Sequence, residues 1–157
     1  MRRIAAAFAA ALCLLLAACG AAAEPAETEM PVIPQETAEE ETGMKLFVGK
    51  TEVPVTWEQN DSVAALRSLA AGDGLTVSMS MYGGFEQVGS IGQNLPRDDR
   101  QTTTDAGDIV LYSGNQIVIF YGSNSWAYTR LGHVDLSRAE MTALLSGGDV
   151  TLRVAAG

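Results

Sequence analysis

The chain has 157 residues and a formal net charge of −9 at pH 7, with 19 acidic against 10 basic side chains. Nucleic acids and anionic headgroups are bound by basic surfaces, so this balance argues against both as partners, and no nucleic acid is expected. The charge is uneven: residues 20–43 hold seven glutamates and no basic residue, whereas residues 44–157 hold twelve acidic and eight basic side chains.

The first residues have the pattern of an export signal. Two arginines, at positions 2 and 3, precede an apolar run at residues 4–16, and small residues follow the run at positions 17–20. The run is shorter than the ~20 apolar residues of a membrane-spanning helix. Residues 1–18 are therefore predicted to be a signal peptide that is removed after export.

The end of this segment, Leu-Ala-Ala-Cys at residues 16–19, resembles the lipobox of bacterial lipoproteins. The resemblance implies that Cys19 becomes the first residue and carries acyl chains such as palmitate. It places the protein on the extracytoplasmic face of the cell membrane, with the bilayer as a partner. Ordinary signal-peptidase cleavage nearby is the alternative. The other cysteine, Cys13, lies in the predicted signal peptide, so no thiol would remain for disulfides or metals.

Residues 19–43 are predicted to be the lipidated cysteine followed by a disordered acidic linker. Glutamate, proline and threonine dominate this segment, and such a composition does not bury enough apolar surface to fold. It is either a tether that holds the domain off the bilayer or an unselected spacer. The remaining residues, 44–157, have a usual length for one folded domain.

The domain is predicted to begin with two strands, residues 44–49 and 52–57, joined by a tight turn. Pro54 lies inside the second strand and restricts its pairing there, because proline has no N–H to donate. Asn60 or Asp61 can cap a helix that follows and covers the core.

Apolar side chains then occur at every second position from Leu75 to Met81, which predicts a strand with one buried face. Residues 85–91 can return as its partner, with Glu86 on the face opposite Phe85. Residues 94–107 are polar and rich in turn formers, so they are predicted to form a long surface loop.

The segment 108–131 has the highest apolar and aromatic content of the domain. Residues 109–112 and 117–121 predict a β-hairpin. After it, alternation would send Trp126, Tyr128 and Arg130 to one side. A capping box at Ser137 and Glu140 opens a second helix, and residues 149–155 form a final strand. About eight strands and two short helices make the domain mainly β, and strands of this number commonly close into a barrel that leaves no free edge.

Several short motifs resemble the small bacterial cyclophilin-like proteins, and the resemblance extends over residues 44–154. The motifs are Phe85-Glu86-x-x-Gly89, Leu95-Pro96, Gly107-Asp108-Ile109-x-Leu111-Tyr112, Ile117-x-Ile119-Phe120-Tyr121-Gly122 and Tyr128-Thr129-Arg130-Leu131-Gly132. The resemblance implies a closed eight-stranded antiparallel β-barrel of the cyclophilin type, capped by helices.

The same resemblance leaves the activity open. Prolyl isomerases of the cyclophilin family use an arginine followed by a phenylalanine and a glutamine that lead into Gly-Gly-Asp. Here Arg97 and Arg100 are followed by Gln-Thr-Thr-Thr-Asp without the phenylalanine. The favoured interpretation is a non-catalytic module that binds a peptide or small ligand. A divergent prolyl isomerase that uses Arg130, and an accessory envelope lipoprotein with a vestigial groove, are the alternatives.

No catalytic residue, metal ligand set or cofactor is assigned. His133 is the only histidine, and a Ser-His-Asp set around it would lack the Gly-x-Ser-x-Gly elbow that presents such a serine. Tyrosine and tryptophan offer flat apolar area with one polar tip, which suits a peptide or planar ligand. The candidate ligand-binding residues are Tyr82, Glu86, Tyr112, Phe120, Tyr121, Trp126, Tyr128 and Arg130.

Overall fold

The structure is a computed structural model that describes residues 43–157 of the chain. The predicted signal peptide, the predicted lipidation site Cys19 and nearly all of the predicted linker lie outside the described residues. Within residues 43–157, neither helix has the length and apolar character that crossing a bilayer requires.

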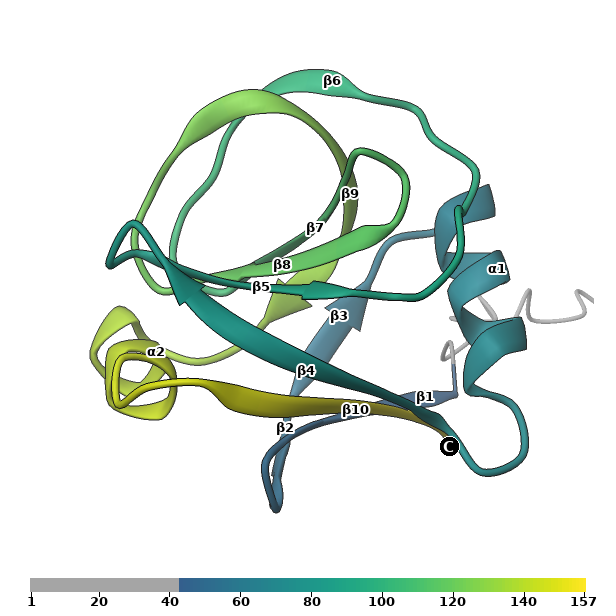
Figure 1. Cartoon of the computed structure of the whole chain (residues 1–157), viewed down its shortest axis with the longest axis horizontal. Coiled ribbons are helices and arrows are strands. Elements are labelled where there is room, and N and C mark those ends of the chain that lie inside the picture. Colours follow the sequence, from purple (N-terminus) through teal and green to yellow (C-terminus); the bar gives the residue numbers. More distant parts are fainter. Residues whose placement is uncertain (1–42) are drawn as a thin grey trace, which may run out of the picture. The chain divides into compact units, whose positions relative to one another are not determined.

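Strands make up most of the described chain, and two short helices accompany them (Figure 1). The helices are α1 (Asp61–Ala70) and α2 (Arg138–Leu145). The strands are β1 (Met44–Val48), β2 (Thr51–Val53), β3 (Val55–Trp57), β4 (Leu75–Tyr82), β5 (Glu86–Ser90), β6 (Arg100–Thr103), β7 (Asp108–Tyr112), β8 (Gln116–Phe120), β9 (Ser125–Val134) and β10 (Val150–Ala156). This composition confirms the predicted mainly β fold.

The strands pair in the order β2-β1-β10-β4-β5-β8-β7-β9-β3, and neighbours in this order run antiparallel. β2 and β3 stand at the two ends of the order, although only Pro54 separates them in the chain. β2 pairs with β1 and β3 pairs with β9, so the two act as one interrupted strand that joins the ends of the sheet into a barrel. Pro54 lies where this strand changes partner.

The predicted strand count of eight differs from the ten observed for two reasons. The interruption at Pro54 divides one strand of the barrel into β2 and β3. In addition, part of the predicted loop at residues 94–107 forms β6, which pairs with the first residues of β9 outside the main order. The loop prediction was wrong there because Arg100–Thr103 carry polar, mostly exposed side chains, without the apolar alternation that marks a strand.

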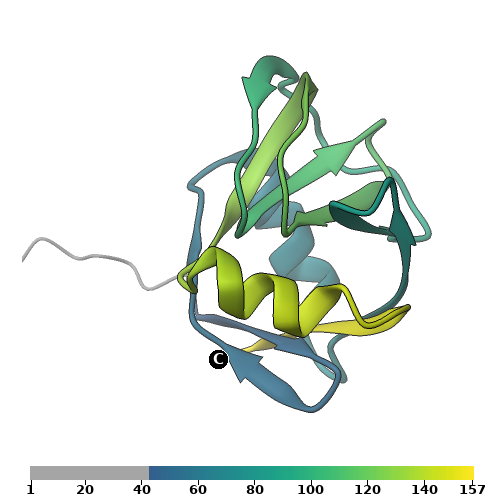
Figure 2. The ribbon, with the colours of Figure 1, turned by 90° about the vertical axis from the view of Figure 1, so that its left-hand side faces the viewer.

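The two helices lie at opposite ends of the barrel, as the front and side views agree (Figures 1 and 2). The Asn60 side chain caps α1 by accepting a hydrogen bond of 2.9 Å from the Val63 N–H. Ser137 and Glu140 form the predicted capping box at the start of α2. Each cap satisfies backbone N–H groups that the helix itself leaves without a partner.

The central hairpin of β7 and β8 buries both of its faces. One face belongs to the barrel interior and contributes Ile109, Leu111, Ile117 and Ile119. The opposite face contributes Val110, Val118 and Phe120 to a second, smaller apolar cluster, which also includes Tyr128 of β9. Because successive side chains of a strand point to opposite faces, this second cluster lies on the outside of the barrel wall.

The end of β4 extends past its pairing with β10, which stops at Met79. Beyond that point β4 pairs with β5 alone, through Ser80, Met81 and Tyr82. Met81 is 42% exposed, so the prediction that it faces the core was wrong. On the opposite face of the same extension, Tyr82 is brought level with the outer apolar cluster.

Candidate functional site

The register of the strands gathers the candidate side chains on the outer face of the barrel wall. Residues directly opposite each other in paired strands share a face. Glu86 of β5 is paired with Tyr82 of β4 on one side and with Phe120 of β8 on the other. The same face continues across β7 and β9, where Val110 of β7 pairs with Val118 and with Arg130.

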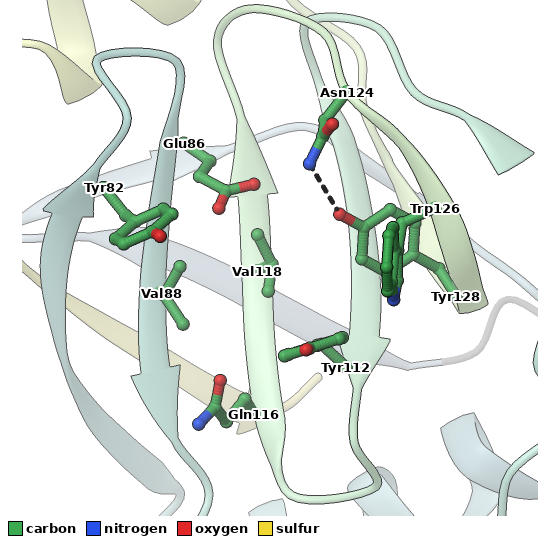
Figure 3. A pocket seen from close by; sticks show the side chains of 9 residues that line it. All are labelled: Tyr82, Glu86, Val88, Tyr112, Gln116, Val118, Asn124, Trp126 and Tyr128. Carbon is green, nitrogen blue, oxygen red and sulfur yellow. Dashed lines mark hydrogen bonds between the residues drawn. The ribbon is translucent and has the colours of Figure 1, made fainter.

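A pocket of about 400 Å³ opens on this face. We call it the aromatic pocket, and Figure 3 shows its nine lining side chains. They are Tyr82, Glu86, Val88, Tyr112, Gln116, Val118, Asn124, Trp126 and Tyr128. Val88 and Val118 lie in the middle, with Tyr82 on one side and Trp126 and Tyr128 on the other (Figure 3). A volume of this size accommodates a small organic molecule.

Glu86 places a carboxyl group among these apolar and aromatic side chains. The residue is 6% exposed, and its carboxyl points toward the centre of the pocket (Figure 3). Its Oε2 atom is buried and has no hydrogen-bond partner within residues 43–157. Burial raises the pKa of Glu86 from 4.5 to about 7, because the charged form loses hydration.

Tyr128 connects the pocket wall to the apolar cluster beneath it. Its ring packs edge-on against Phe120 and Tyr112, with ring centres 5.8 and 6.1 Å apart. The Asn124 amide donates a hydrogen bond of 3.1 Å to the Tyr128 hydroxyl. Burial, and then the nearby Glu86 carboxyl, raise the pKa of the Tyr128 phenol. This side of the pocket is therefore held in place by its own packing and hydrogen bonding.

Trp126 and Tyr82 form the open sides of the pocket. Trp126 is 57% exposed and Tyr82 is 67% exposed, whereas Tyr128 of β9 is buried. Large apolar side chains rarely gather at the surface without a role in binding. The two exposed rings can therefore contact a ligand that rests on the valines of the floor.

The structure does not bring all eight candidate residues together. Tyr82, Glu86, Tyr112, Trp126 and Tyr128 line the aromatic pocket. Phe120 is fully buried beneath Tyr128. Tyr121 faces the barrel interior, where its hydroxyl has no hydrogen-bond partner among the described residues.

Arg130 lies in a separate polar cluster. Its guanidinium donates to Asp108 at 2.8 Å and lies 3.4 Å from Glu58, and His133 Nδ1 lies 3.0 Å from the same Asp108 carboxyl. Burial alone would raise the pKa of Asp108, but hydrogen bonds from the Asp105 backbone, His133 and Arg130 hold that pKa below its ordinary value. Arg130 is thus committed to an ion pair and does not line the aromatic pocket.

Four lining residues were not predicted: Val88, Gln116, Val118 and Asn124. Val88 and Val118 could have been found from the alternation of their strands, which places them on the same face as Glu86 and Phe120. Gln116 is the first residue of β8 and lies on the same face as Val118, but the predicted strand began one residue later. Asn124 carries no such signal, because it precedes β9. Within residues 43–157, no group of three or more histidine, cysteine or acidic side chains is arranged to hold a metal ion.

Residues 46–155 match the model of the cyclophilin-like family, which is most of the chain. The chain belongs to the cyclophilin-like family. The match spans the barrel and both helices, in agreement with the motifs from which the resemblance was inferred. The aromatic pocket is therefore a feature on the outer wall of a cyclophilin-like domain.

One similar solved structure is described as McbB in complex with tryptophan. It superposes with a TM-score of 0.52 and 12% sequence identity, over 72% of this chain and 44% of McbB. The chain thus spans less than half the length of that protein, and the likeness concerns the fold of the cyclophilin-like domain alone. No curated protein matches the sequence.

Proposed function

We propose that this protein is a lipid-anchored binding protein whose cyclophilin-like domain holds a small ligand in the aromatic pocket without converting it. The main support is the pocket itself, which combines an apolar floor, aromatic walls and the Glu86 carboxyl, whose buried Oε2 has no hydrogen-bond partner among residues 43–157. Ligand sites are typically apolar concavities with a few polar groups that fix orientation. The size suits a small molecule or one side chain of a peptide.

The alternatives receive less support from the geometry. A divergent prolyl isomerase was expected to use Arg130, and that side chain is paired with Asp108 and Glu58 away from the pocket. A vestigial groove would be filled by its own side chains. Here Trp126 and Tyr82 leave an open volume between them instead.

The anchor is proposed from the sequence alone. Residues 16–19 resemble a lipobox, and acylation of Cys19 would hold the domain on the extracytoplasmic side of the membrane. Two or three acyl chains give stable anchoring, because each buried methylene contributes about 0.8 kcal/mol. Mass spectrometry of the membrane-extracted protein is expected to find a diacylglyceryl group on Cys19 as the first residue. An unmodified first residue at any other position would contradict the anchor.

Binding can be tested by titrating the full-length protein with aromatic probes and with short Xaa-Pro peptides. Tryptophan is one suitable probe, because a protein of the same fold has been solved with it. We expect Trp126→Ala to weaken binding about tenfold, since stacking on an exposed aromatic ring contributes roughly 1–3 kcal/mol. Calorimetry and NMR shift changes measure this directly.

Met81→Ala is the matched control for this experiment. Met81 is also an exposed apolar side chain near the tip of β4, but it points away from the pocket, so its removal should leave binding unchanged. Equal losses in the two variants, or no binding of any probe, would contradict the proposed site. Catalysed cis–trans exchange of the peptides would contradict a role without turnover.

A further inference from the structure

The charges around the aromatic pocket are one-sided. Among its nine lining residues Glu86 is the single acid, and none is a lysine, arginine or histidine. Burial without an ion-pair partner destabilises the ionised form of a carboxyl group. A cation that enters the pocket removes this penalty by pairing with the carboxylate. An anionic ligand would meet the Glu86 charge with no compensating group, so the pocket discriminates against anions.

The aromatic walls favour the same kind of ligand. Tyr82, Tyr112, Trp126 and Tyr128 surround the space into which the Glu86 carboxyl points (Figure 3). The face of an aromatic ring carries partial negative charge and attracts ammonium groups, most strongly for tryptophan. Rings and carboxyl thus act on one ligand group together.

We infer that the ligand of the aromatic pocket is an organic cation, whose ammonium group pairs with Glu86 while its apolar body lies on Val88 and Val118 between the aromatic walls. The inference rests on the proposed function and adds the chemical class of the ligand. Both primary and methylated ammonium groups fit this description, since the rings accept either and Glu86 supplies the opposite charge.

The pH dependence of binding distinguishes this role of Glu86 from a second one. A protonated Glu86 could donate a hydrogen bond to a neutral ligand, and such binding would weaken as the acid ionises. A cation needs the ionised form, so its binding strengthens as the pH rises through about 7 and then levels off. The other titratable groups facing the pocket are the phenols of Tyr82, Tyr112 and Tyr128, and burial raises the pKa of the Tyr128 phenol.

Three probes of similar size separate these cases: 2-phenylethylamine (a cation), 2-phenylethanol (neutral) and 3-phenylpropionate (an anion). Binding to the full-length protein is measured by calorimetry at about pH 5.5 and pH 8. At pH 8 we expect the amine to bind about tenfold more tightly than the alcohol and the acid not to bind. The amine should bind about tenfold more weakly at pH 5.5, and its binding there should release a fraction of a proton, because pairing lowers the pKa of Glu86.

Two variants complete the test. Glu86→Gln keeps the shape of the side chain and is expected to weaken binding of the amine about tenfold while leaving the alcohol unchanged. Glu52→Gln removes the same charge from the exposed β2 strand and should change neither. If alcohol and amine bind alike and Glu86→Gln has no effect, the cation inference is overturned while the binding pocket stands. If no probe binds to the wild-type protein, both the inference and the proposed function fail.

Discussion

Replacing Glu86 by glutamine is expected to raise the free energy of unfolding by about 2 kcal/mol at pH 8 and to change it little at pH 4. The reason is the raised pKa of about 7 in the folded state, against 4.5 for an unhindered glutamate. A shift of this size corresponds to about 3 kcal/mol at most. The pocket mouth admits solvent, which reduces the penalty on the charged form.

Stability falls as the pH rises because the folded protein holds the Glu86 proton to a higher pH than the unfolded chain does. Below pH 4.5 the carboxyl is protonated in both states and contributes no penalty. Between pH 4.5 and 7 the unfolded chain gives up the proton while the folded protein keeps it, so the contribution of Glu86 to stability is lost as the pH rises. Above pH 7 the loss is complete, and glutamine, which carries no charge, avoids it.

Urea unfolding of the full-length wild type and the Glu86→Gln variant at both pH values measures this difference. The change in free energy between the two proteins isolates Glu86 from the other groups that titrate. Glu52→Gln serves as the control, because Glu52 is half exposed and forms a surface ion pair with Lys45. An identical pH dependence in wild type and Glu86→Gln would show that Glu86 ionises freely in the folded protein.

Phe120→Ala is expected to lower the free energy of unfolding by about 3–4 kcal/mol. Phe120 is fully buried, and its ring supports Tyr128 from below. Removing the ring leaves a cavity in the outer apolar cluster, next to Val110 and Val118. The variant should therefore lose stability and ligand binding together, since the Tyr128 wall would no longer be held.

Trp126→Ala is the matched comparison on the same face. Trp126 is 57% exposed, so its truncation should cost less than about 1 kcal/mol of stability while it weakens binding. Thermal unfolding and chemical denaturation of both variants measure the contrast. If Trp126→Ala proved the more destabilising of the two, the assignment of Phe120 to support and Trp126 to contact would be reversed.

The sequence could show which candidate side chains share a face of a strand, but not which of the two faces carries the pocket. Phe120 is the last residue of β8 and Tyr121 follows it, so the two side chains point to opposite faces, and alternation alone cannot say which face is interior. Arg130 does share a face with Tyr128, as alternation predicts. Its partner Asp108, however, lies where β7 and β9 shift register between Ile109 and Val110, and no local pattern predicts such a shift.

The barrel was the more predictable part of the molecule. The hairpin of β7 and β8 and the cap of α2 depend on local patterns, namely continuous apolar runs around a turn and a capping box, and both were confirmed. Burial of Glu86 could not be predicted from local patterns, because it depends on which strands pair. Its strand neighbours Tyr82 and Phe120 come from positions four residues before it and 34 residues after it, and only the folded register brings them together.

The place of β10 in the sheet has a consequence for how the barrel is completed. β10 comes after the other nine strands of residues 43–157, yet it lies between β1 and β4, and its pairing of Met44 with Ala156 spans nearly the whole domain. A nascent chain that has not yet produced residues 150–156 leaves β1 and β4 each with an unpaired edge. Open edges of this kind recruit strands from other molecules, so we expect chains shortened at this strand to associate rather than remain monomeric.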